Sequence, residues 1–108
     1  MGQRTLGGAD LSALRERYRR VVETELPQEA RSQGSWPIED DHCFARVVLD
    51  NLYQDRWDAH IEKRPAYKQL SPSELRDAIR IAEQLLETGA PLVDELNQRS
   101  LEWRREHR

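Results

Sequence analysis

The chain has little of what characterises secreted, membrane-spanning or nucleic-acid-binding proteins. Only one of its 108 residues is cysteine, so no internal disulfide can form and a reducing, cytoplasmic location is expected. No apolar run is long enough to cross a membrane, and the first residues lack the hydrophobic segment of a signal peptide. With 17 basic and 20 acidic residues the formal net charge is −3, which argues against a dedicated nucleic-acid binder.

Glycine and proline are also scarce, at five residues each, and no segment alternates apolar and polar side chains as a β-strand would. The length suits a single domain with one core. We therefore predict an all-α fold, a compact bundle of about four helices with a structured loop before the second. Residues 1–9 are expected to form a flexible N-terminus and residues 10–108 one helical domain.

The first two helices are predicted from apolar spacing and from their end signals. Asp10 is a suitable N-cap for the first helix, and Pro27 is expected to end it. Asp40 and Asp41 can cap the second helix, which is expected to span about residues 41–61, because no helix-breaking residue precedes Pro65.

The third helix has the clearest start signal in the chain. Ser71, Pro72 and Glu74 form a capping-box sequence with proline at the first helical position. Gly89 is placed to end this helix, and Pro91 is placed to begin a fourth.

The predicted second helix has an unusual polar face. On a regular helix, six polar and aromatic side chains would lie within ~80° of one another. They are His42, Arg46, Asp50, Tyr53, Trp57 and His60. The opposite face is apolar and is expected to face the core; its members are Phe44, Val47, Val48, Leu52 and Ala59. The polar face either binds a small polar or aromatic ligand or is covered by neighbouring loops.

Asn51 and Asp55 are expected to project toward the apolar face of this helix. If they are buried, they need hydrogen-bond partners and would act as structural anchors. If the helix rotates or ends near Asp55, both lie in water. The sequence leaves these alternatives open.

His42 and Cys43 are the candidates for catalytic chemistry, since a helix N-terminus lowers the pKa of a thiol. A single cysteine is more often inert, so no catalytic residue is assigned. Asp40, Asp41, His42, Cys43 and His60 are metal-ligand types. Neighbouring helical residues point about 100° apart, however, and no zinc-type spacing is present. We expect no metal site and no cofactor.

One pattern resembles a known group of proteins over residues 36–103. The order W-P-I-x-x-D-H-C-F-x-R, then L-D, then R-P-A-Y-K-x-L is similar to small uncharacterised proteins of cyanobacteria and proteobacteria, some of which carry an acetyltransferase label. The matching residues are Trp36, Pro37, Ile38, Asp41, His42, Cys43, Phe44, Arg46, Leu49, Asp50, Arg64, Pro65, Ala66 and Tyr67. The resemblance implies no established activity.

A second match covers residues 4–9, which fit the R-x-x-G-x-A pyrophosphate-binding signature of GCN5-related N-acetyltransferases. That family places the signature after a long central strand, and only three residues precede it here. We interpret the match as coincidence.

These observations favour a cytoplasmic, non-enzymatic module that binds a protein partner or a small polar or aromatic ligand. The residues expected to bind are Trp36, His42, Arg46, Asp50, Tyr53, Trp57, Arg64 and Tyr67. Association into a homodimer is a further expectation. The alternative is an enzyme, either an acyl-coenzyme A-dependent N-acetyltransferase or one using His42 and Cys43, which would need both residues near a pocket.

Overall fold

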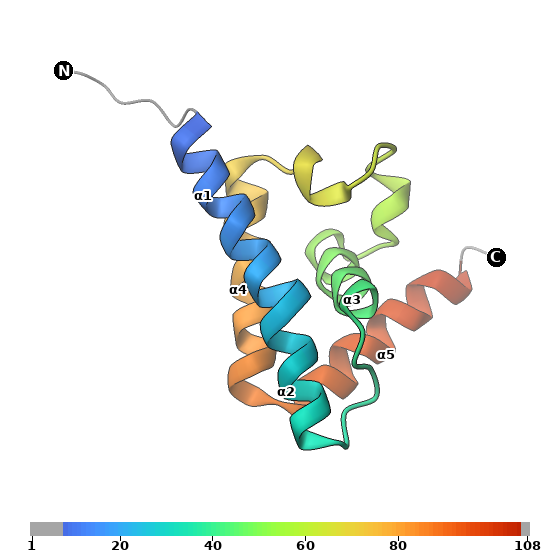
Figure 1. Cartoon of the computed structure of the whole chain (residues 1–108). Coiled ribbons are helices and arrows are strands. Elements are labelled where there is room, and N and C mark those ends of the chain that lie inside the picture. Colours follow the sequence, from blue (N-terminus) through green and yellow to red (C-terminus); the bar gives the residue numbers. More distant parts are fainter. Residues whose placement is uncertain (1–7, 107–108) are drawn as a thin grey trace.

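The computed structural model describes residues 8–106, and within this range it contains helices and no strand (Figure 1). The helices are α1 (Gly8–Arg19), a π-helical segment η1 (Arg20–Glu25), α2 (Leu26–Gln33), α3 (Asp41–Tyr53), α4 (Pro72–Thr88) and α5 (Ala90–Glu106). Two 3-10 turns, η2 (Trp57–Ala59) and η3 (Ala66–Gln69), lie between α3 and α4. Because α1, η1 and α2 are continuous, residues 8–106 form four helical rods, and the predicted all-α bundle is confirmed.

The first rod does not end at Pro27, so that prediction was wrong. In an α-helix, proline removes one N–H donor and clashes with the carbonyl four residues earlier. Here the preceding turn is π-helical, and the N–H of Leu26 donates to the carbonyl of Val21, five residues back. The wider turn accommodates the proline ring, which is buried. The rod ends at Gly34, whose φ of 73° is left-handed.

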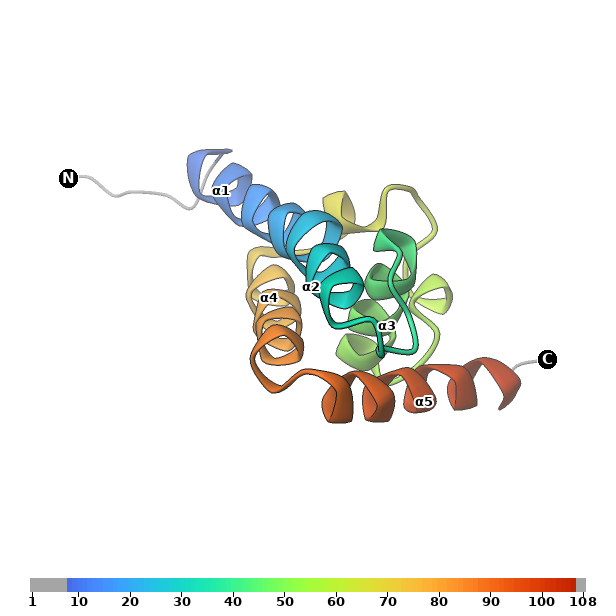
Figure 2. The same ribbon diagram turned by 60° about the horizontal axis from the view of Figure 1, so that its bottom comes forward.

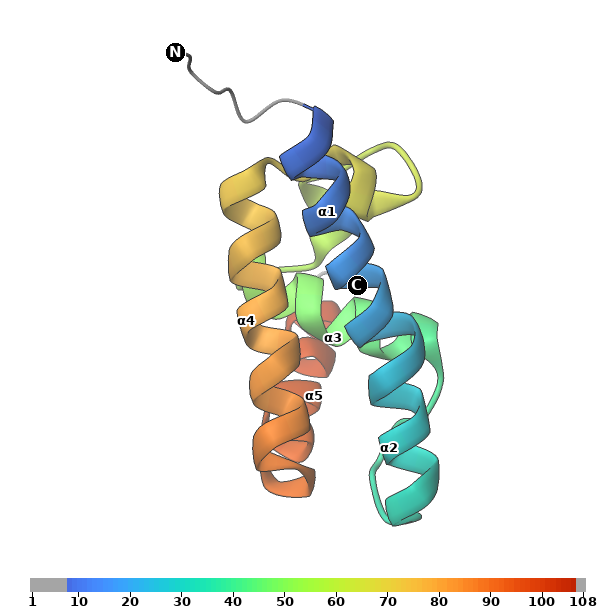
Figure 3. The same cartoon turned by 60° about the vertical axis from the view of Figure 1, so that its left-hand side comes forward.

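The helices are arranged around α3. Figure 3 shows α4 lying alongside the rod formed by α1 and α2, and Figure 2 shows α5 passing across the end of α3. Helix α3 contacts η1, α4 and α5. Its apolar face supplies the centre of the core, where Phe44, Val47 and Val48 have no exposed surface. The apolar face of α3 is therefore packed against several neighbouring helices, which fix the position of α3 in the bundle.

The start and end of α4 agree with the sequence. The Ser71 hydroxyl accepts a hydrogen bond from the Glu74 N–H at 3.1 Å, and the Glu74 carboxylate accepts one from the Ser71 N–H at 2.9 Å. These reciprocal bonds satisfy two donors at the helix start. Gly89 ends α4 with φ 81° and ψ −148°, a conformation that is essentially restricted to glycine.

Helix α3 ends at Tyr53, about eight residues before the expected end, so that boundary was wrong. Gln54 adopts a left-handed conformation with φ 54°, and its N–H donates to the carbonyl of Asp50. The chain then leaves the helix axis and forms η2. As a result Trp57 and His60 are not on α3, and Ala59 is exposed and not part of the core.

None of the helices described is both long and apolar enough to span a membrane. The expected flexible N-terminus falls partly outside the described range, which begins at residue 8. The match to the pyrophosphate signature lies there too, apart from its last two residues, which belong to α1.

Candidate functional site

A cavity of about 430 Å³ lies between η1, the first half of α3 and residues 64–67. Five of the eight residues expected to bind line it together, although they come from three different segments. They are His42, Arg46, Trp57, Arg64 and Tyr67. Most of the predicted set therefore shares one concave surface, but that surface is not the continuous helix face that the sequence predicted.

The floor of the cavity is apolar. Val22 from η1 and Leu49 from α3 are almost completely buried beneath it, and the largely buried Ala66 adds to the apolar lining. Tyr18 lines the wall and stacks on Tyr67, with ring centroids 5.8 Å apart. Burial, followed by the charge of nearby Glu23, raises the pKa of the Tyr18 phenol, so this side chain stays neutral. Such a floor suits an apolar or aromatic group.

The rim of the cavity carries charges of both signs. The Arg64 guanidinium lies over the Trp57 ring, 4.8 Å from its centroid. Arg46 is the second cation, and Glu23 and Asp41 are the two carboxylates of the lining. A ligand in the cavity would therefore meet an apolar floor, two aromatic rings and ionic groups at the edge.

Helix α5 holds the Arg46 side chain in place. The two terminal nitrogens of Arg46 donate hydrogen bonds to Ser100 Oγ at 2.7 Å and to Asn97 Oδ1 at 2.9 Å, and both acceptors belong to α5. A guanidinium bound in this way has lost much of its rotamer freedom. The cavity therefore contains one cation whose position is set by the fold.

Asp50 holds the second important cavity residue, Trp57. Its Oδ1 accepts a hydrogen bond from the Trp57 backbone N–H at 2.9 Å, and its Oδ2 accepts one from Ser100 Oγ at 2.6 Å. Two nitrogens of Arg104 donate to the same carboxylate at 2.8 and 2.9 Å. Asp50 has no exposed surface. It was expected on the open polar face, and that placement was wrong.

Trp36 and Tyr53 also lie away from the cavity. Trp36 packs edge-on against Phe44, with centroids 6.0 Å apart, and joins the loop before α3 to the core. Tyr53 stacks on His60 at 4.6 Å and donates a hydrogen bond to Glu74 at 3.1 Å. Partial burial and the nearby Glu74 carboxylate raise the pKa of Tyr53 to about 12. Both aromatic side chains stabilise the fold.

Asn51 and Asp55 behave differently from each other. The half-buried Asn51 donates from Nδ2 to the carbonyls of Val47 and Leu96, at 2.7 and 3.1 Å, so it links α3 to α5. Asp55 lies beyond the end of α3, where it accepts a hydrogen bond from the Arg56 N–H and pairs with His60. Asn51 is therefore a half-buried anchor, as the first alternative expects, whereas the helix ends near Asp55, as the second expects, without leaving Asp55 fully in water.

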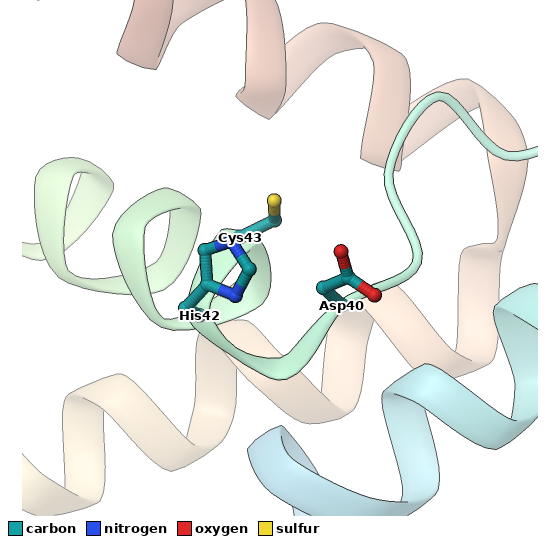
Figure 4. A group of neighbouring side chains, drawn as sticks. All are labelled: Asp40, His42 and Cys43. Carbon is teal, nitrogen blue, oxygen red and sulfur yellow. The ribbon is translucent and has the colours of Figure 1, made fainter.

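Three metal-ligand types meet at the start of α3 (Figure 4). Donor atoms of Asp40, His42 and Cys43 all lie within 4.8 Å of one another. Asp40 precedes the helix and has extended backbone, so the 100° spacing of helical residues does not apply to it. His42 lines the cavity described above, whereas Cys43 does not.

The sequence reasoning missed the residues of α5 that support the site. Asn97, Ser100 and Arg104 follow Val93 at steps of four, three and four, so they continue the inward face of α5 in polar form. That spacing could have indicated an inward-facing polar network. No protein-family model, curated protein or solved structure matches this chain.

Proposed function

We propose that the protein is a small binding module and that the cavity between η1, α3 and residues 64–67 is its ligand site. One observation carries this proposal. The cavity gathers five residues of the expected binding set, and two of them, Arg46 and Trp57, are held by the partly buried hydrogen bonds that they donate to α5 and to Asp50. Rigid polar groups around an apolar pocket are typical of small-molecule sites.

The lining favours a ligand with an aromatic or apolar body and a charged end. Trp57 and Tyr67 contribute aromatic surface to the lining, and Val22 and Leu49 contribute apolar surface. Guanidinium groups bind carboxylates well, so Arg46 and Arg64 favour an anionic group. Glu23 and Asp41 add a position for a cationic group, so a zwitterion would satisfy both kinds of charge.

The alternative hypothesis, that the protein is an enzyme, receives less support. A nucleophilic thiol must reach the bound substrate, and Cys43 is not among the cavity-lining residues. Binding by a protein partner through this surface is compatible with the lining as well.

Titration of ¹⁵N-labelled protein with three indole compounds tests the proposal. Indole-3-acetate, tryptamine and tryptophan share a ring and differ in charge, so they separate the contributions of the anionic, cationic and zwitterionic ends. In the NMR spectra, we expect the amide chemical-shift changes to concentrate around the cavity and to saturate as ligand is added. The changes should be largest for tryptophan or indole-3-acetate.

Two variants make the titration specific. Ala45 lines the cavity, so Ala45→Trp should fill it and abolish the shifts. Ala13→Trp places the same bulk on an exposed position of α1 and should leave them unchanged. Shifts that scatter over the surface, or that survive in Ala45→Trp, would refute the proposal.

A further inference from the structure

We propose that Asp40, His42 and Cys43 form a binding site for a single zinc ion at the start of α3. The site shares His42 with the lining of the cavity, but the proposal does not depend on which ligand the cavity binds. It rests on the convergence of a carboxylate, an imidazole and a thiol within 4.8 Å, which the sequence spacing alone did not predict.

The geometry needs little adjustment to hold an ion. Zinc bonds of ~2.0–2.3 Å in a tetrahedral arrangement place two ligand atoms about 3.3–3.7 Å apart. The donor atoms therefore need to approach by roughly 1.5 Å at most. The His42 side chain is 78% exposed and that of Asp40 is 56% exposed, so both have room to change rotamer toward the half-buried Cys43.

The Asp40 carboxylate has no competing role as a helix cap. Asp40 has the extended backbone of an N-cap residue, with φ −95° and ψ 150°, but its side chain caps no backbone N–H. Its neighbour in space is Arg31, whose guanidinium lies 3.9 Å away at an exposed position. An exposed ion pair of this length contributes little, so it is easily replaced by a metal bond.

Asp41 completes the arrangement as a supporting group. One of its oxygens lies 3.7 Å from His42 Nδ1, so a small shift allows it to accept a hydrogen bond from that nitrogen. A carboxylate in this place fixes the imidazole tautomer and leaves Nε2 to bind the ion. The set then has three protein ligands and an open fourth position, the ligand count of catalytic zinc sites.

The chemical types of the three ligand atoms indicate which metal ion the site would prefer. A thiolate together with imidazole favours zinc over magnesium or calcium, which prefer oxygen ligands alone. With the thiol deprotonated, Asp40 and Cys43 carry two negative charges that a divalent cation would neutralise. Binding should therefore release the thiol proton to the buffer.

Cobalt(II) titration of the reduced, full-length protein tests the site. A thiolate ligand gives Co²⁺ a charge-transfer absorption band, and competition with ZnCl₂ then gives the zinc affinity. We expect one equivalent to bind. Cys43→Ser should remove the band, and His42→Gln and Asp40→Asn should each weaken zinc binding by at least ~10-fold. His60→Gln is the matched control, because His60 also pairs with an aspartate, Asp55, outside the cluster.

The outcomes separate this proposal from the proposed function. Arg64→Ala removes a cavity cation and should leave zinc binding unchanged. Alkylation of Cys43 should slow when zinc is present in the wild type but not in His42→Gln, which gives a second readout that does not depend on Co²⁺. Absence of the charge-transfer band, or equal zinc affinities in wild type and Cys43→Ser, would overturn the proposal.

Discussion

Replacing Arg104 by methionine should destabilise the protein strongly, although the residue lies near the end of α5 and is partly exposed. Asp50 is fully buried, and Arg104 is its charged partner, with two hydrogen bonds of 2.8 and 2.9 Å. Methionine retains much of the length and apolar contact of the side chain. It leaves the Asp50 carboxylate with only the Ser100 hydroxyl and the Trp57 N–H as donors.

The magnitude follows from the cost of an uncompensated buried charge. Removing one partner of a buried ion pair destabilises a protein by ~3–5 kcal/mol. We expect the lower end of this range, ~3 kcal/mol, because the Arg104 side chain is 28% exposed and two neutral donors remain. For a domain of this size, that free energy lowers the melting temperature by on the order of 15 °C.

The assay is urea unfolding followed by far-UV circular dichroism, with two comparisons. Arg99→Met, on the same helix, breaks an exposed pair with Glu95 and should cost under ~1 kcal/mol. Arg104→Met in an Asp50→Asn background should likewise cost under ~1 kcal/mol, because no charge is left unpaired. If Arg104→Met and Arg99→Met had equal effects, the network would have no special role in stability.

Three further predictions concern single positions. Ser71→Ala should cost ~1 kcal/mol in urea unfolding, because the N-cap of α4 is lost, and an effect below 0.3 kcal/mol, roughly the scatter of such data, would contradict it. Gly89→Ala should cost ~1–3 kcal/mol through backbone strain at φ 81°, and an equally stable variant would show that the turn relaxes. The pKa of Tyr53, raised to about 12, predicts a contribution to stability that is complete below pH 10 and is lost as the pH rises toward 12. Tyr53→Phe should therefore lose less stability than the wild type between about pH 10 and pH 12, and the buried Tyr18, whose pKa is also raised, should add to the alkaline loss in both proteins.

Local signals with a direct physical mechanism predicted the fold correctly. The capping box of Ser71 and Glu74 satisfies backbone donors within one turn, so it needs no knowledge of the rest of the chain. The apolar positions of α3 from Phe44 to Val48 were likewise recognisable from their spacing.

Two boundaries depended on features that the sequence does not encode locally. Pro27 is compatible with a helix only because the preceding turn is π-helical, and that turn also places Val21 and Val22 in the core. Gln54 adopts a left-handed conformation although glutamine is not a typical residue there. The Asp50 carboxylate accepts a hydrogen bond from the N–H of Trp57, which lies just beyond Gln54. This hydrogen bond favours the early end of α3.

The candidate site was predicted through its residue types and not through its geometry. Extending α3 to residue 61 assigned Asp50 and Trp57 to one exposed stripe, whereas one is buried and the other approaches the cavity from η2. Arg64 and Tyr67 come from a loop whose path cannot be read from periodicity. The sequence thus identified five of the thirteen lining residues as binding residues, but not the contacts that bring them together.

Native mass spectrometry of the protein purified gently from its own host tests the central claim most directly. The account predicts that the wild type carries a small organic molecule at one per chain, and that Ala45→Trp, prepared in the same way, does not. Ala13→Trp should retain the molecule. Equal occupancy in wild type and Ala45→Trp would show that the cavity is not the binding site and would contradict the account.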